Sequence, residues 1–122
     1  MILADTSIWI DHLRGCKTDM PSFLSAGQIV MHPLVVAEIA LGSLKHRKKT
    51  LTLLESLWQV KMAELDEVRR MIEAHHLYSK GLGVTDAHLA ASCLLTSGIK
   101  LWTRDAALDR AAQSLGIRAP FA

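Results

Sequence analysis

Short, mainly apolar runs recur along the chain and predict buried β-strands. They lie at Ile2–Ala4, Gln28–Met31, Trp58–Met62, Ile99–Trp102 and Ile117–Arg118. Runs of this length, bounded by polar or turn-forming residues, are typical of strands that are covered on both faces. The pattern therefore predicts five short strands, and the first and fourth of them end close to an aspartate.

Between these runs, the apolar residues follow a helical spacing. In the clearest segment, Glu64–Ser79, the residues Leu65, Val68, Ile72 and His76 recur every three to four positions along one face. Together with caps and helix breakers, this spacing predicts helices at Thr6–Leu13, Pro21–Ala26, Pro33–Leu41, Lys48–Leu57, Glu64–Ser79, Asp86–Thr96 and Asp105–Leu115. The hydroxyl of Thr85 is expected to cap the helix that begins at Asp86.

Strands that alternate with helices predict the α/β class. Each helix serves as a crossover between strands, so the central sheet should be mainly parallel and flanked by helices on both faces. A chain of 122 residues without a linker or an internal repeat is expected to fold as one domain over residues 1–122.

The composition predicts an ordered protein. Hydrophobic residues make up 50% of the chain and charged residues 21%, which excludes an intrinsically disordered chain. The formal net charge of +2 is too small to indicate nucleic-acid binding by itself, although Lys45–Lys49 forms a concentrated basic run. No apolar run approaches the roughly 20 residues that span a bilayer. We therefore expect a cytoplasmic protein without membrane contact.

Two cysteines, Cys16 and Cys93, form neither a zinc-binding spacing nor a disulfide framework. Cys93 lies in an apolar segment and is expected to be a small buried hydrophobic residue.

Three aspartates stand at predicted helix starts. Asp5 and Asp105 follow strands, and Asp86 opens the helix after Thr85. Each of them taken alone is explained as well by helix capping, worth about 1 kcal/mol, as by metal binding. Because ligand sites in open α/β sheets form beyond the carboxyl ends of the strands, Asp5 and Asp105 are nevertheless candidates for one shared site.

Glu38 lies too far inside its predicted helix to cap it. Its neighbours on the same helical face are apolar or glycine, so we expect a buried carboxylate that needs a partner, a proton or a metal ion. The alternative is a position on a narrow solvent-facing strip. Several carboxylates that meet in space would suit Mg²⁺ or Mn²⁺ and, with it, phosphate-ester chemistry.

Four short motifs occur in order along the chain. They are Asp5-Thr6-Ser7, Ala37-Glu38-Ile39, Thr85-Asp86-Ala87 and Thr103-Arg104-Asp105. In order, spacing and length they resemble the PIN domain, and most closely the VapC toxins of type II toxin–antitoxin systems. The resemblance covers essentially the whole chain. It departs from many relatives at His32-Pro33, where a serine or threonine commonly precedes the glutamate-bearing helix.

The resemblance implies a metal-dependent endoribonuclease that is inhibited by a cognate antitoxin. Asp5, Glu38, Asp86 and Asp105 match the acidic quartet of the family. Asp5 and Asp86 would be direct or water-mediated ligands of Mg²⁺ or Mn²⁺, and Glu38 and Asp105 would complete the cage. A water activated by the metal would hydrolyse RNA and leave a 5′-phosphate and a 3′-hydroxyl. Which carboxylate helps to deprotonate the water is left open.

The resemblance extends to supporting residues and partners. Ser7 and Thr103 match hydroxyl positions that help to place bound water or a substrate phosphate. Candidates for contacts with RNA phosphates are Arg104, Lys45, Arg47, Lys48 and Lys49. The family also implies a homodimer.

Two residues near the quartet have alternative interpretations. Asp109 lies one helical turn after Asp105 and is either a fifth acid or a solvated residue. His88 follows Asp86 by two positions, and we expect an ordinary surface histidine there.

Two other classes of protein remain as alternatives. A phospho-accepting receiver domain also has an acidic Mg²⁺ pocket in a parallel α/β fold, but it would need adjacent acids after an early strand and would give Glu38 no role. A catalytically silent binding module would keep the fold and lose acids of the quartet, whereas this chain has all four.

Overall fold

A three-stranded parallel sheet lies at the centre of the computed structural model, which describes residues 1–121. The strands are β1 (Ile2–Ala4), β2 (Ile29–Val30) and β3 (Lys100–Trp102), in the order β2-β1-β3. In the register of the sheet, Leu3 is paired with Val30 on one side and with Leu101 on the other. The predicted α/β class with a parallel sheet is confirmed.

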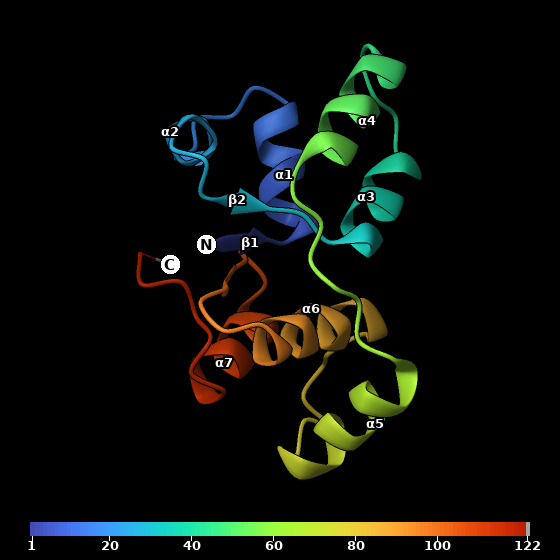
Figure 1. Cartoon of the computed structure of the whole chain (residues 1–122), viewed down its shortest axis with the longest axis vertical. Helices are drawn as coiled ribbons and strands as arrows, with labels where there is room; N and C mark the ends of the chain where they lie inside the picture. The colour runs from blue at the N-terminus through green and yellow to red at the C-terminus, as the bar shows by residue number, and fades with distance from the viewer. Residues whose placement is uncertain (122) are drawn as a thin grey trace.

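Seven helices surround this sheet within the described residues. They are α1 (Thr6–Leu13), α2 (Met20–Ser25), α3 (Pro33–Ala40), α4 (Arg47–Ser56), α5 (Leu65–Ala74), α6 (Val84–Leu95) and α7 (Ala106–Ser114). Helices α1, α3 and α4 lie above the strands in Figure 1, α6 and α7 lie below them, and α5 lies outside α6. Every residue of β1 and β2 is buried, and because successive side chains point to opposite faces of a sheet, both faces are covered.

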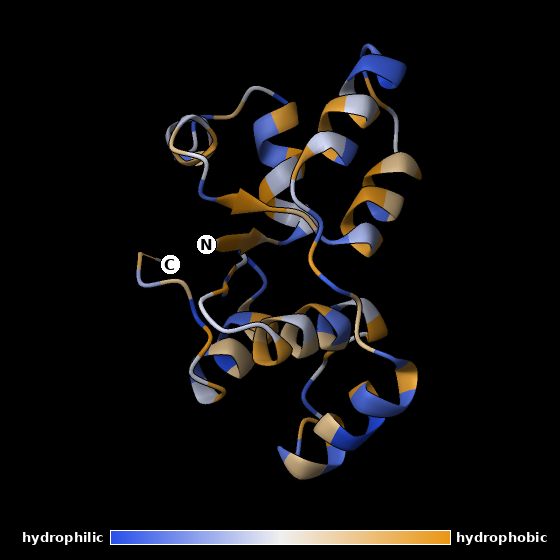
Figure 2. Cartoon of the chain, in the orientation of Figure 1, coloured by the Kyte–Doolittle hydropathy of each residue, from blue (hydrophilic) through white to orange (hydrophobic). Residues whose placement is uncertain are grey.

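The core is centred on the strands, which are the most uniformly hydrophobic segments of the cartoon (Figure 2). Leu3, Val30 and Leu101 are completely buried, as are Ile39 of α3 and Leu89 of α6. Because apolar side chains fix the strands on both faces, the residues that follow β1 and β3 are held at one edge of the sheet.

Two of the predicted strands are reduced to single parallel bridges beside the sheet. Trp58–Met62 contributes only an isolated bridge between Met31 and Gln59, and Ile117–Arg118 contributes only a bridge between Leu101 and Arg118. Trp58 and Met62 are both exposed, so their apolar character does not reflect a place inside the sheet.

The helix predicted over Glu64–Ser79 ends at Ala74. His76 and Ser79 adopt left-handed backbone conformations, with φ of 53° and 59°, and a residue in that conformation cannot continue a right-handed helix. The predicted cap at Thr85 is also wrong, because α6 already begins at Val84 and Thr85 lies within its first turn.

None of the helices in residues 1–121 is both long enough and apolar enough to cross a membrane.

Candidate active site

Asp5 is the most firmly held acid of the site. It follows β1, caps α1 and is only 7% exposed. Its Oδ1 accepts a hydrogen bond from the Thr6 N–H at 2.7 Å, and its Oδ2 accepts one from the Thr103 hydroxyl at 2.7 Å. The Ser7 hydroxyl lies 3.4 Å from the same Oδ2. Capping and site formation are therefore not alternatives for Asp5, since one oxygen serves the helix and the other faces β3.

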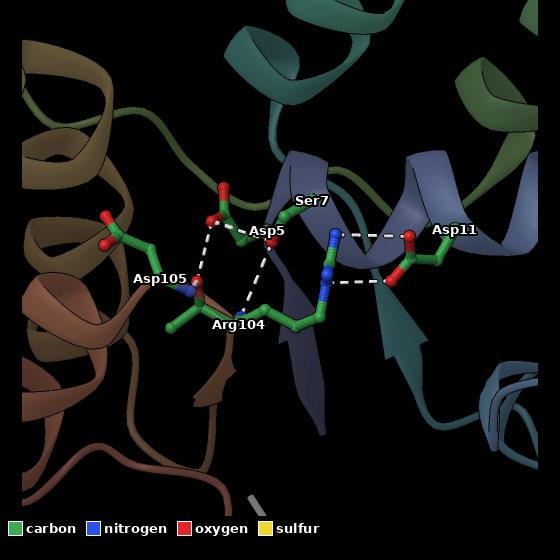
Figure 3. A network of polar contacts seen from close by, with 6 residues as sticks. Asp5, Ser7, Asp11, Arg104 and Asp105 are labelled. Carbon is green, nitrogen blue, oxygen red and sulfur yellow. Dashed lines mark hydrogen bonds and ion pairs between the residues drawn. The ribbon is translucent and has the colours of Figure 1, made fainter.

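The end of β3 is joined to Asp5 through Thr103. The buried Thr103 hydroxyl donates to Asp5 and accepts from the Asp105 N–H at 3.0 Å (Figure 3). The Asp105 carboxylate is exposed and caps α7 by accepting from the Ala107 N–H at 3.1 Å. The two strand ends are thus linked by one hydroxyl.

Glu38 is exposed, which corrects the expectation that it is buried. Val35 and Ile39 of α3 are completely buried, whereas Glu38 lies on the other side of this helix. Its Oε1 accepts a hydrogen bond of 2.6 Å from the hydroxyl of Thr6. Thr6 is the residue next to Asp5, so this hydrogen bond holds the exposed Glu38 side chain close to the site.

Asp86 is the acid whose pKa is affected by the charges of the other three acids. It is half-buried in the first turn of α6. Burial raises the pKa of this carboxyl above its usual value, a hydrogen bond from the Gly83 N–H opposes the rise, and the negative charges of Asp5, Asp105 and Glu38 raise the pKa further. The four carboxylates therefore share one electrostatic environment, although they are up to 100 positions apart in the sequence.

The donor chemistry of this cluster fits a hard divalent cation. Four carboxylates supply only oxygen ligands, and a cation would relieve the repulsion that adds to the effect of burial on the pKa of Asp86. As the side chains stand, no group of three or more His, Cys, Asp or Glu in residues 1–121 is arranged to hold a metal ion. The residues thus provide the right atoms without a preassembled coordination shell.

Arg104 faces α1 and forms a two-point ion pair there. Its Nε lies 2.8 Å from Asp11 Oδ2, and one terminal nitrogen donates to Asp11 Oδ1 at 3.1 Å (Figure 3). The Arg104 N–H also lies 3.5 Å from the Ser7 hydroxyl. The guanidinium that was expected to meet RNA is therefore paired with an acid of the protein.

The basic run divides into two parts. The guanidinium of Arg47 donates to the carbonyls of Ala40 and Gly42, where it ties the start of α4 to the end of α3. Lys45, Lys48 and Lys49 are exposed, and Lys45 lines a groove of about 390 Å³ beside residues of α1 and α3.

Asp109 pairs with Arg118 at 2.9 Å, so its interaction in the structure is with a C-terminal arginine.

Sequence reasoning missed the contributions of Thr6 and Asp11. Thr6 has a hydroxyl directly beside Asp5, and Asp11 follows Ser7 by four positions, which places it on the same face of α1. A hydroxyl beside an acid and a four-residue spacing on a helix both occur often in proteins, so neither feature singled these residues out. His88 was also misjudged, because it is buried and not a surface residue.

Comparison with known proteins agrees with the geometry. The profile of the PIN domain matches residues 2–114, a range that includes all four acids. Among curated proteins, ribonuclease VapC32 from two strains of Mycobacterium tuberculosis is 43% identical over 117 residues. The aligned region covers 96% of this chain and 94% of that relative.

Proposed function

Because the chain belongs to the VapC branch of the PIN-domain family, we propose that it is a metal-dependent endoribonuclease toxin of a type II toxin–antitoxin system. The observation that carries the proposal is the gathering of the acids at one edge of the sheet, where hydrogen bonds of Thr103 join Asp5 to Asp105 and a hydrogen bond of Thr6 holds Glu38. The charges of Asp5, Asp105 and Glu38 also add to the effect of burial in raising the pKa of Asp86. Repulsion among acids is costly unless a cation offsets it, and the similar proteins are named ribonucleases. Residues 1–122 form one PIN domain in this proposal.

The proposed cation is Mg²⁺ or Mn²⁺. Asp5 and Asp86 would hold it directly or through water, and Glu38 and Asp105 would complete the oxygen cage. When bound, such a cation polarises a phosphoryl oxygen and lowers the pKa of a water that attacks the phosphodiester.

The chain's own contribution is to orient its carboxylates. Asp5 is fixed at both oxygens, by the Thr6 N–H and by the Thr103 hydroxyl. Glu38 is fixed at one oxygen by the Thr6 hydroxyl. Thr103 is thus proposed to act by orienting Asp5, and Ser7, more loosely hydrogen-bonded, is the hydroxyl that remains for a substrate phosphate. Acids that are already oriented need little rearrangement during the reaction.

The proposed substrate is RNA, cleaved to leave a 5′-phosphate and a 3′-hydroxyl. Lys45, Lys48 and Lys49 are exposed and can meet phosphates. Arg47 and Arg104 would have to leave partners within the protein to do so. The proposal further includes a cognate antitoxin that inhibits the enzyme, a homodimer, and a cytoplasmic location.

The direct test uses purified protein, RNA, and buffers with or without Mg²⁺ or Mn²⁺. Cleavage should require the metal and should fall at least a hundredfold in Asp5→Asn and in Glu38→Gln. Asp19→Asn is a matched control, because Asp19 is exposed and its side chain forms no capping hydrogen bond with α2. Cleavage that survives both site substitutions would contradict the proposed site. Transferable phosphate on Asp5 without RNA cleavage would instead favour a receiver domain.

A selective enzyme can leave bulk RNA intact, so the second test is made in cells. New 5′-phosphate ends should accumulate at defined RNA positions when the wild-type chain is produced. They should be absent when Asp5→Asn is produced at the same level. An identical set of ends in both cultures would contradict the proposal.

A further inference from the structure

Two histidines outside the acidic quartet meet in the interior between α3 and α6. His32 is completely buried and His88 is 8% exposed. Their ring centroids lie 6.4 Å apart, with the ring planes inclined by 64°. Within residues 1–121, His32 Nε2 and His88 Nδ1 are both buried without a hydrogen-bond partner. Buried polar atoms are normally paired, so two such atoms on neighbouring rings need an explanation.

The protonation of His32 follows from its role as the N-cap of α3. Its Nδ1 accepts a hydrogen bond from the Leu34 N–H at 3.0 Å, so Nδ1 carries no proton. A neutral imidazole has one N–H, which must then be on Nε2. The unpaired atom of His32 is therefore a hydrogen-bond donor.

The unpaired atom of His88, Nδ1, can serve as the hydrogen-bond acceptor that this donor lacks. A neutral His88 that carries its proton on Nε2 presents Nδ1 as an acceptor. In the described part of the chain no direct hydrogen bond joins the rings, and with ring centroids 6.4 Å apart the two nitrogens need one bridging water to be connected. We propose that one water bridges a neutral pair of histidines, accepting from Nε2–H of His32 and donating to Nδ1 of His88, and that this pair positions Glu38 relative to Asp86.

The positions of the two rings explain the effect on the acids. His32 caps the helix that carries Glu38, and His88 lies two residues after Asp86 on α6. In the described residues, no other hydrogen bond or ion pair links α3 directly to α6. Because helices are rigid over a few turns, a link between these two rings constrains the separation of the two carboxylates. His32 and His88 act as positioning residues.

Electrostatics support the neutral form of His32. Burial lowers the pKa of His32 to about 4, and a positive charge on His88 would lower this pKa further. A proton on Nδ1 of His32 would also remove the acceptor that caps α3. His32 is therefore neutral near pH 7 and keeps its Nε2–H.

The existence of the pair is tested without metal or RNA. Long-range ¹⁵N–¹H NMR of the histidine side chains near pH 7 should show both rings neutral, with protons on Nε2 only. In a double-mutant cycle, the effects of His32→Asn and His88→Phe on the unfolding equilibrium constant should be coupled by about fivefold. A proton on His88 Nδ1, a charged His32, or additive effects would overturn the pair.

The positioning role rests on the proposed function and is tested with two variants of His32. Asn retains an acceptor that can cap α3 but does not reach His88, whereas Gln keeps a donor near the place of Nε2 and gives up the cap. Calorimetric titration with Mn²⁺ alone should show a five- to tenfold loss of affinity in His32→Asn and near wild-type affinity in His32→Gln. On RNA, His32→Asn should lower kcat at saturating Mn²⁺ and leave KM unchanged.

A role in capping alone would give the opposite order of Mn²⁺ affinities, and equal affinities would refute the positioning role. If the wild-type chain neither binds Mn²⁺ nor cleaves RNA, the proposed function and the positioning role fail, whereas the NMR and unfolding measurements still decide whether the pair exists.

Discussion

The hydroxyl of Thr103 donates a hydrogen bond to Oδ2 of Asp5 at 2.7 Å, across 98 positions of sequence. The same hydroxyl accepts from the Asp105 N–H. Thr103 is therefore the residue through which the ends of two neighbouring strands fix one acid and orient the backbone of another.

Replacing Thr103 by valine should preserve shape and remove this link. Asp5 Oδ2 would keep only the longer contact with Ser7, so we expect a loss of about 1–3 kcal/mol in the free energy of unfolding. RNA cleavage should fall ten- to a hundredfold, as measured by initial rates, and Thr103→Ser should restore most of it. Thr52→Val is the control, because the exposed Thr52 donates only to the Lys48 carbonyl within α4. Wild-type cleavage in Thr103→Val would contradict the orienting role.

The ion pair between Arg104 and Asp11 should contribute little to stability. The Arg104 side chain is 61% exposed, and exposed pairs contribute about 0–1 kcal/mol. If Arg104 exchanges this partner for an RNA phosphate, Arg104→Gln should make the dependence of log affinity on log salt shallower by about 0.7. Binding is measured in the Asp5→Asn background to prevent cleavage. An unchanged slope would remove Arg104 from the RNA contacts, and Asp11→Asn controls for loss of the ion pair itself.

The free energy of unfolding should depend on pH through His32. Its pKa is lowered from 6.5 to about 4 in the folded chain, first by burial and then by His88 across the interface with α6. Between these two pH values the unfolded chain binds a proton at His32 and the folded chain does not. The contribution of His32 to the free energy of unfolding is therefore fully present above pH 6.5 and falls as the pH decreases toward 4. The loss attributable to His32 should reach about 3 kcal/mol.

Urea unfolding at several pH values between 7 and 4 measures this dependence. Asparagine at position 32 does not titrate, so His32→Asn should flatten the curve over this range. A variant curve parallel to that of the wild type would show that other groups cause the pH dependence.

The two cysteines should differ strongly in reactivity. Burial raises the pKa of the Cys93 thiol to about 12, against an opposing effect of Lys100, whereas Cys16 is exposed. Because the thiolate is the nucleophile, a thiol reagent at pH 8 should modify one thiol per folded chain and two in denaturant. Cys16→Ser should abolish the reaction of the folded chain. Fast modification of both thiols would contradict the burial of Cys93.

The local signals in the sequence located most elements and two of the acids correctly. Asp5 and Asp105 cap α1 and α7 as expected, and Pro33 occupies the first turn of α3. These features depend on a few neighbouring residues and on the hydrogen bonds that a helix start leaves open. Helix caps and helix starts depend only on a short stretch of sequence, so they could be predicted from it.

Burial and strand pairing were less predictable because they depend on distant partners. Apolar neighbours suggested a buried Glu38, but one of them, Leu41, is 89% exposed. Trp58–Met62 looks like a strand, yet only Gln59 finds a bridge partner. Nothing in the sequence around His88 predicts that its ring lies near the ring of His32. Only the folded chain brings these residues together.

The separation between Asp5 and Thr103 also determines when the site can exist during synthesis. The central strand β1 is made first, whereas its neighbour β3 and the hydroxyl that orients Asp5 are made about 100 residues later. A nascent chain that ends at Gly98 contains Asp5, Glu38 and Asp86 but lacks the strand that aligns the first of them. A growing chain therefore cannot complete this acidic site while most of it is still being translated, and the ribosome that makes it is working beside an unfinished nuclease.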